Sequence, residues 1–166
     1  MLRRGPERAG TVQNNSDIWE LWPAGELDLP RILEIDRESI TPPWTELDMQ
    51  SELGRADSTF IAAAEYGGVS VVGFIILRRV SIDEGEIFRI AVAKSARRRG
   101  VGDMLMRMIL NYADNIALKT LYLEVRESNK AAITLYRKYG FVQSGRRKGY
   151  YDNPTEDATI MTRTTP

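Results

Sequence analysis

A loop rich in arginine and glycine is the first segment whose residue types point to chemistry. It runs from Lys94 to Gly102 and contains the run Arg97-Arg98-Arg99-Gly100-Val101-Gly102. Apolar residues recur at helical spacing from Val101 onward, which predicts that an amphipathic helix begins there. The first N–H groups of a helix lack partners within it and carry partial positive charge, so they attract phosphate. Gly100 and Gly102 would let the backbone approach an anion closely, and the arginines would add charge-assisted hydrogen bonds.

This loop alone does not identify a binding site, because a solvated basic turn before a helix has the same composition. It also departs from two common nucleotide-binding motifs. Leu105 stands where the dinucleotide-binding pattern G-x-G-x-x-G has its third glycine, and no Gly-Lys-Ser or Gly-Lys-Thr follows as in a P-loop. The loop is a candidate anion site, and its meaning depends on its surroundings.

Two absent residue types narrow the possible chemistry. The chain has neither cysteine nor histidine, which excludes a thiolate nucleophile, a Ser-His-Asp triad and the usual zinc sites. An enzyme with this sequence would use carboxylates, tyrosines, lysines and backbone dipoles. The 23 basic and 23 acidic residues cancel, so no overall field draws the chain onto nucleic acid or an anionic membrane. The apolar run from Val69 to Leu77 is too short to span a bilayer, and we expect a cytoplasmic protein with no membrane role.

The chain length of 166 residues suits one domain with its own core. Residues 1–16 are polar and without periodicity, so we expect a flexible arm there and the folded domain over 17–166. Predicted strands cover Ile18 to Trp22, Thr59 to Tyr66, Val69 to Val80, Glu86 to Val92, Thr120 to Val125, Phe141 to Lys148 and Ala158 to Arg163. Helices are predicted after Asp28, from Thr45, from Val101 and after Ser128 as N-cap. Gly67-Gly68 indicates a tight hairpin turn, and the whole order indicates a mixed α/β domain.

Four segments, which follow one another along the chain, carry a family resemblance. They are EIFRIAV, the arginine and glycine loop, LYLEVRESNKAAITLYRKYGF and RRKGYY. Over roughly Ile18 to Thr162 the chain resembles the GNAT superfamily of N-acetyltransferases, and within it the RimI-type ribosomal-protein-alanine N-acetyltransferases. The block from Glu124 to Tyr136 is the most specific part. The resemblance implies a GNAT fold, with a mixed, mostly antiparallel sheet of about seven strands, flanking helices, and a splay between strands four and five that admits acetyl-CoA. It implies no metal.

The resemblance also implies which residues bind the co-substrate acetyl-CoA. The backbone of strand four would hold the pantetheine, the glycine loop would cradle the pyrophosphate, and an asparagine would bind further along the arm. The matching positions are Ile90, Ala91, Val92, Arg97, Arg98, Arg99, Gly100, Val101, Gly102, Asp103 and Asn129. Asp103 departs from many relatives, which carry a basic or neutral residue there, and an acid suits a phosphate site only if its side chain turns away.

The same resemblance assigns an acid and a base. Acetyl transfer needs a neutral amine, but an α-amino group with a pKa of about 7.7 to 8.0 is mostly protonated at neutral pH. Glu124 matches the base, which accepts the proton directly or through a water, and Tyr136 matches the acid that protonates the departing thiolate. Without the surrounding block, Glu124 would be read as the polar side of an alternating strand and Tyr136 as part of an apolar helix face.

The acceptor is less constrained than the chemistry. Trp44 and Tyr151 match aromatic residues that help to form a peptide groove, although Trp44 also suits a packed loop anchor. We expect the acceptor to be a protein N-terminus, with the N-terminal alanine of a small-subunit ribosomal protein as the leading case. The alternatives are a small-molecule amine, a lysine side chain, or a non-catalytic CoA-binding module. We expect no direct nucleic-acid role, and a monomer or weak dimer, because no apolar stripe exceeds an ordinary core face.

Overall fold

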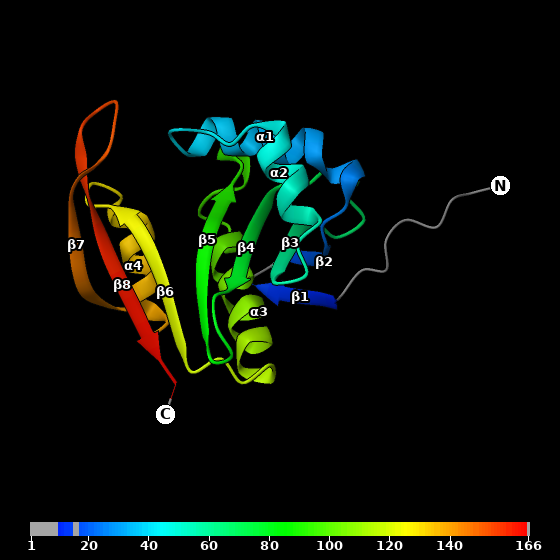
Figure 1. The fold of residues 1–166 in the computed structure, drawn as a ribbon. Coiled ribbons are helices and arrows are strands. Elements are labelled where there is room, and N and C mark those ends of the chain that lie inside the picture. The colour runs from blue at the N-terminus through cyan, green and yellow to red at the C-terminus, as the bar shows by residue number, and fades with distance from the viewer. Residues whose placement is uncertain (1–9, 15–16, 166) are drawn as a thin grey trace.

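The computed structural model describes residues 10–14 and 17–165, which form one sheet with helices on both faces (Figure 1). In chain order the elements are β1 (Gly10–Asn14), β2 (Asp17–Pro23), the 3-10 helix η1 (Glu26–Asp28), α1 (Leu29–Ser39), α2 (Glu46–Leu53), β3 (Ser58–Glu65), β4 (Gly73–Arg79), β5 (Glu84–Val92), the 3-10 helix η2 (Lys94–Ala96), α3 (Val101–Asn115), β6 (Thr120–Arg126), α4 (Lys130–Lys138), β7 (Val142–Tyr151) and β8 (Glu156–Thr164). The strand order in space is β1-β2-β3-β4-β5-β6-β8-β7.

The sheet divides between β5 and β6. These two strands form the one parallel pair of the described sheet, and they pair only where Glu84–Glu86 lies beside Thr120–Tyr122. Beyond that short contact they diverge, as the gap between them in Figure 1 shows. This confirms the predicted mixed, mostly antiparallel α/β sheet and its splay.

An eighth strand lies at the edge of this sheet, within the segment predicted as a flexible arm. Residues 10–14 form β1 and pair with β2, from Gly10 beside Leu21 to Asn14 beside Asp17. Residues 1–9 and 15–16 of the predicted arm lie outside the described residues. The difference has a physical reason, because the open edge of β2 offers backbone hydrogen bonds to a neighbouring strand whatever its side-chain pattern. With β1 added, predicted strands four and five are β5 and β6.

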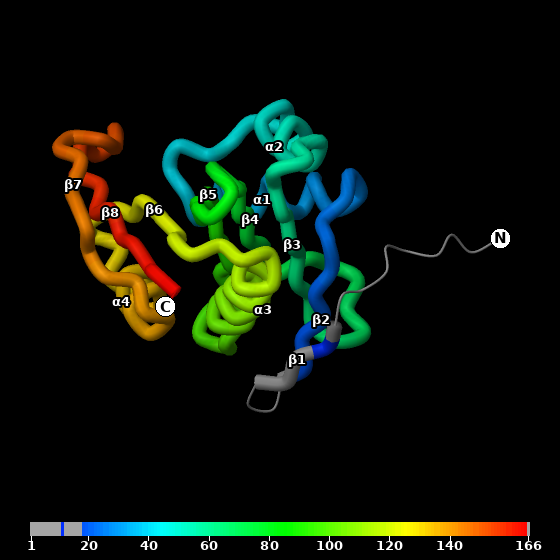
Figure 2. Tube along the Cα trace, turned by 60° about the horizontal axis from the view of Figure 1, so that its bottom comes forward, coloured from blue at the N-terminus to red at the C-terminus, as the bar shows by residue number. Residues whose placement is uncertain are grey.

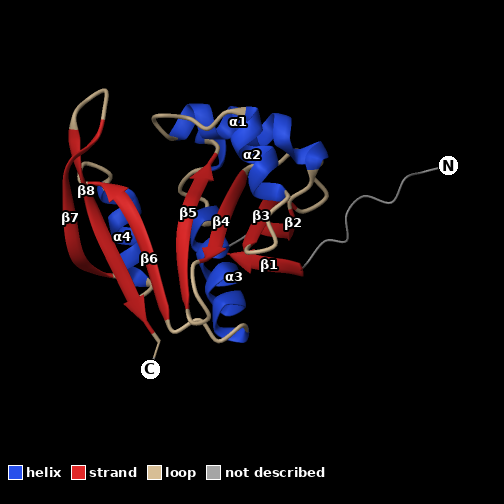
Figure 3. Ribbon diagram, in the orientation of Figure 1, coloured by secondary structure: helices blue, strands red, loops and turns tan. Residues whose placement is uncertain are grey.

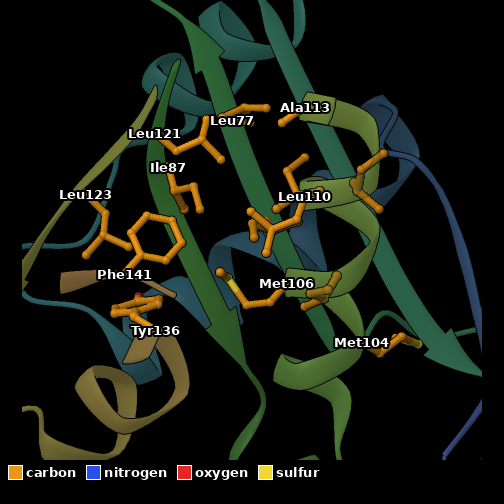
Figure 4. Close-up of a cluster of buried hydrophobic side chains, with 14 of the residues drawn as sticks. Leu77, Ile87, Met104, Met106, Leu110, Ala113, Leu121, Leu123, Tyr136 and Phe141 are labelled. Atoms are coloured by element: carbon orange, nitrogen blue, oxygen red, sulfur yellow. The ribbon is translucent and has the colours of Figure 1, made fainter. Parts of the chain in front are cut away.

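The helices form two layers. Figure 2 shows α1 and α2 on one side of the sheet and α3 and α4 on the other. Each layer has its own apolar cluster, because alternate residues of a strand face opposite sides: Phe60 of β3 faces α1, and Ile61 faces α3. The cluster under α3 and α4 spans both halves of the divided sheet, with Met106 and Ile87 on one side and Phe141 on the other (Figure 4).

Two local predictions were wrong. The Gly67-Gly68 pair does not make a tight two-residue hairpin, because β4 begins only at Gly73 and Val69 in the connecting loop is 99% exposed. The start of that loop, from Val69, has the apolar composition of a strand, but regular pairing begins only near Val72, whose N–H donates to the Ala63 carbonyl at 2.8 Å. The N-cap of α4 is Asn129 rather than Ser128, since the Asn129 side chain accepts a hydrogen bond from the Ala132 N–H at 3.1 Å. An asparagine oxygen caps as well as a serine one, so sequence alone did not separate the two.

Candidate active site

A cavity of about 780 Å³ lies where β5 and β6 diverge. Its walls come from both halves of the sheet and from loops at the open end. The residues that line it include Thr41, Pro42, Trp44, Glu86, Phe88, Ile90, Glu124, Arg126, Asn129, Tyr136, Tyr150, Tyr151 and Asp152. We call this cavity the cleft. It brings together the predicted base and acid, one predicted pantetheine residue, the asparagine and both predicted groove aromatics.

Glu124 reaches the cleft because β6 alternates. Its neighbours Leu123 and Val125 are buried in the core, so the Glu124 side chain points to the opposite face, where it is 21% exposed. The carboxylate atom Oε1 accepts a hydrogen bond from Arg147 Nη1 at 2.8 Å. Burial, together with a hydrogen bond to Glu124, raises the pKa of Tyr150. Glu124 is therefore held by a guanidinium and a phenol, both from β7.

A second carboxylate, that of Glu86 on β5, lines the same cleft. Partial burial, and then the charge of Glu124, raise the pKa of the Glu86 carboxyl above its ordinary value. Residue-by-residue analysis of the sequence missed it. The available signal was its place in the EIFRIAV strand, four residues before the predicted pantetheine segment.

Tyr136 both packs in the core and lines the cleft. Its side chain is 6% exposed, and its ring lies 6.1 Å from that of Phe141 (Figure 4). Burial, with a smaller contribution from Tyr151, raises the pKa of the Tyr136 hydroxyl far above its ordinary value. The phenol therefore keeps its proton across the physiological pH range. The two interpretations of Tyr136 from sequence, core packing and a site position, do not exclude each other.

The two predicted groove aromatics line opposite parts of the cleft. Trp44 follows α1 and packs at a tilted angle against Phe88, with ring centroids 6.4 Å apart. Tyr151 ends β7, and the Arg126 guanidinium lies 4.3 Å from its ring centroid. Burial, and then the charge of Glu124, raise the pKa of Tyr151 to about 12. Trp44 is thus a packed loop residue that also faces the cleft.

A buried ion pair fixes the segment that carries Trp44. Asp36 of α1 is fully buried and binds Arg89 of β5 through two contacts, of 2.7 and 3.0 Å. The same carboxylate accepts a hydrogen bond from the Trp44 N–H at 2.7 Å, and Arg89 also donates to the Pro42 carbonyl at 2.9 Å. Sequence reasoning missed this pair, because nothing local links two residues that lie 53 positions apart.

The end of β5 has an unpaired edge inside the splay. Residues from Ile90 to Val92 pair with β4 on one side, and the β5–β6 pairing has already ended at Glu86. Backbone groups on the β6 side of this segment therefore lack a strand partner, which suits a ligand that accepts and donates along an extended arm. Ile90 itself lines the cleft.

The start of α3 follows directly from this edge. Gly100 is its N-cap with a φ of 87°, a left-handed conformation that favours glycine, and no side chain caps the helix. Two of the arginines before it contact protein groups. Arg97 donates to the Val92 carbonyl at 3.0 Å and to Ser39, and Arg99 binds Glu65 at 2.9 Å. The uncapped backbone N–H groups are thus the groups of this loop whose geometry suits an anion.

The first turn of α3 also touches α4. A methyl group on Gly102 would lie 3.3 Å from Leu135 Cδ2, so this glycine permits a close approach of the two helices. Asp103 points to α4, where its carboxylate binds Lys138, and it also lies 3.4 Å from Arg107. Partial burial is the largest single influence and opposes ionisation, but hydrogen bonds from Lys138 and Tyr139 and the charges of Lys138 and Arg107 together outweigh it, so the pKa of Asp103 is lowered. The acid has therefore turned to basic partners, which removes the conflict with a phosphate nearby.

Two further observations concern other kinds of site. Within residues 10–14 and 17–165, no three or more acidic side chains gather in a way that would hold a metal ion. None of the helices in the same ranges combines the length and apolar character needed to cross a membrane.

Comparison with known proteins gives a consistent result. The model of the acetyltransferase (GNAT) family matches residues 29–141. A [ribosomal protein bS18]-alanine N-acetyltransferase from Salmonella typhimurium is 34% identical over 136 residues, which cover 81% of this chain and 89% of the relative. The crystal structure of the ribosomal-protein-S18-alanine N-acetyltransferase from Escherichia coli superimposes with a TM-score of 0.80 at 30% identity, covering 88% of this chain and 93% of that one. The NatC complex bound to Gag peptide and CoA shares the fold, with a TM-score of 0.79 at 19% identity over 89% of this chain and 99% of that one.

Proposed function

Because the chain belongs to the acetyltransferase (GNAT) family and is an acetyl-CoA-dependent N-acyltransferase, we propose that its acceptor is the α-amino group of a protein. The leading substrate is the N-terminal alanine of a small-subunit ribosomal protein, and such a substrate puts the reaction in the cytoplasm. The observation that carries the proposal is the similarity over most of both chains to an enzyme named for this reaction. The aromatic side chains of Trp44 and Tyr151 in one cleft support a peptide acceptor.

Acetyl-CoA fits the splay and the start of α3. The unpaired edge of Ile90–Val92 suits the amide groups of pantetheine, and the uncapped N–H groups from Val101 onward suit the pyrophosphate. Asn129 uses its Oδ1 to cap α4, so its amide nitrogen is the group that remains for the pantetheine arm. Arg98, exposed and with a left-handed φ of 61°, is the arginine of the loop best suited to add charge beside the phosphates.

The reaction then needs three proton transfers. Glu124 takes a proton from the acceptor ammonium, directly or through a water. The neutral nitrogen attacks the thioester carbonyl, and a backbone N–H near Val92 stabilises the oxyanion. The C–S bond breaks as the tetrahedral intermediate collapses, and the CoA thiolate takes the proton of the Tyr136 hydroxyl. The proton that the attacking nitrogen still carries then passes to the Tyr136 phenolate, which restores the hydroxyl and leaves a neutral amide. The products are the N-acetylated chain and CoA, formed without a covalent acyl-enzyme.

The test is CoA release from acetyl-CoA with an alanine-initiated ribosomal peptide. Spermidine and a lysine peptide serve as alternative acceptors. The same ribosomal peptide with a blocked N-terminus serves as the negative control. Glu124→Gln and Tyr136→Phe are each expected to lower kcat about 100-fold to 10,000-fold, since general acid–base groups contribute that much. The KM for acetyl-CoA should change little.

Glu127→Gln is the matched control, because Glu127 is an exposed carboxylate three residues from Glu124 and pairs with Arg146 outside the cleft. Turnover of the blocked peptide at the same rate would refute the α-amino acceptor. Full activity in both Glu124→Gln and Tyr136→Phe would refute the assigned chemistry while leaving the acceptor intact.

A further inference from the structure

Arg126 joins two loops on opposite sides of the cleft. It is the last residue of β6, and its side chain is 17% exposed. Its Nη2 donates to the carbonyl of Thr41 at 3.1 Å and to that of Asp152 at 3.0 Å. Its Nη1 donates to the carbonyl of Pro154 and to Glu156, each at 3.2 Å. Among the residues that the structure describes, no other side chain hydrogen bonds to both loops.

These loops belong to different halves of the sheet. The first lip, residues 40–45, connects α1 to α2, and the second lip, residues 152–155, connects β7 to β8. Figure 3 shows both at the open end of the splay, far from the short β5–β6 contact that joins the halves. Because the carbonyls of Thr41 and Asp152 share one nitrogen, Arg126 holds the lips within the reach of a single guanidinium.

The rest of the site gives this bridge its orientation. Glu156, which directly follows the second lip, pairs with Arg126, and the Arg126 guanidinium lies over the ring of Tyr151. The first lip is independently fixed to β5, because Arg89 donates to the carbonyl of Pro42. The first lip is therefore anchored to one half of the sheet, and Arg126 ties the other half to it.

We propose that Arg126 is a positioning residue that sets the width of the cleft, and so its preference for a chain terminus over an internal lysine. The inference rests on the proposed function. A terminal amine enters with chain on one side only, whereas a lysine carries chain on both sides of its residue and needs more room between the lips. Arginine suits this role because its planar fork offers donors in several directions, while a lysine ammonium at the same position cannot reach both lips in one fixed geometry.

The experiment compares Arg126→Lys and Glu156→Gln with wild type. Glutamine keeps the Oε1 acceptor that binds the Ser128 N–H but removes the charge that orients Arg126. Arg163→Lys is the control, because Arg163 is 19% exposed on β8 and pairs with Asp114 away from the cleft. Each protein is assayed on an alanine-initiated peptide and on an N-terminally blocked peptide with one internal lysine.

Arg126→Lys is expected to raise the KM for the N-terminal peptide roughly tenfold or more, as expected for a misplaced acceptor. The KM for acetyl-CoA should stay unchanged, and the preference for the N-terminal over the lysine peptide should fall. Glu156→Gln should also raise the KM for the N-terminal peptide and lower the preference for it, each by less than Arg126→Lys does. Arg163→Lys should change neither the KM for the N-terminal peptide nor the preference. An unchanged preference in Arg126→Lys would overturn the proposal.

A distance measurement tests the bridge without catalysis. The chain has no cysteine, so spin labels on Pro43→Cys and Thr155→Cys, both exposed, report the spacing of the two lips alone. The distance distribution should broaden in Arg126→Lys and stay narrow in Arg163→Lys, and an unchanged distribution would overturn the proposal. A wild type without N-terminal activity would refute the proposed function, and the spin-label result would still decide whether Arg126 holds the lips together.

Discussion

Replacing Arg89 with methionine would leave the Asp36 carboxylate buried and almost unpaired. Asp36 is fully buried and Arg89 is 10% exposed, so water cannot replace the guanidinium. The Trp44 N–H would remain as the one donor to the carboxylate. Removing one partner of a buried ion pair costs about 3 to 5 kcal/mol. In a domain of this size, each kcal/mol lowers the melting temperature by roughly 2 to 4 °C.

The assay is urea unfolding of four proteins: wild type, Arg89→Met, Asp36→Asn and the double variant. The double variant should be more stable than Arg89→Met, because a neutral amide is cheaper to bury than an unpaired carboxylate. Arg55→Met is the control, since Arg55 and Asp57 form an exposed pair of little expected value. If Arg89→Met destabilises the protein no more than Arg55→Met does, the reasoning from burial is wrong.

Two further substitutions test other parts of the structure. The raised pKa of Glu86 means that the folded chain binds its proton more tightly than the unfolded chain, so ionisation costs stability as pH rises above the ordinary value of 4.5. Glu86→Gln should therefore stabilise the protein against urea near neutral pH and lose that gain below 4.5, and an equal gain at both would contradict this. Gly85→Ala should destabilise by about 1 to 3 kcal/mol in the same assay, because overpacking a core has that cost. The added methyl group would lie 2.8 Å from Leu118 Cδ1 and 3.0 Å from Leu121 Cδ2. An unchanged urea midpoint would contradict this prediction, because it would mean that the two leucine side chains move aside at no cost.

Sequence periodicity predicted the elements whose burial follows a simple repeat. In α3, Val101, Leu105 and Ile109 are buried as their helical spacing predicted, and β6 alternates buried and half-buried residues along its length. Such patterns report which face of an element meets the core, and that is the quantity periodicity measures. The fold class followed from the order of these elements together with the family resemblance.

Other features depend on partners that are distant in sequence, and periodicity does not report them. The Asp36–Arg89 pair and the Arg126 bridge each join segments that no local pattern connects. The contacts of Arg97 and Arg99 with protein groups were likewise not predicted, while their predicted role beside the phosphates stays a prediction. In the candidate site, the family resemblance of the segment from Glu124 to Tyr136 supplied both of these residues. Glu86 was missed because its place in the EIFRIAV strand does not show that it faces Glu124 across the splay.

The division of the sheet also bears on how the protein is made. Residues from β1 to α3 build the five strands on one side of the splay, and residues from β6 to β8 build the three on the other. Each half is continuous in sequence, so during translation the first can complete its strand pairs before the second has left the ribosome.

The first half is nevertheless incomplete by itself. Met106 of α3 and Ile87 of β5 share their apolar cluster with Phe141, which belongs to the second half (Figure 4). That surface stays exposed until the last 45 or so residues arrive, because the cluster closes only when β6 docks beside β5. The cleft, which takes its walls from both halves, therefore cannot form before the second half has docked.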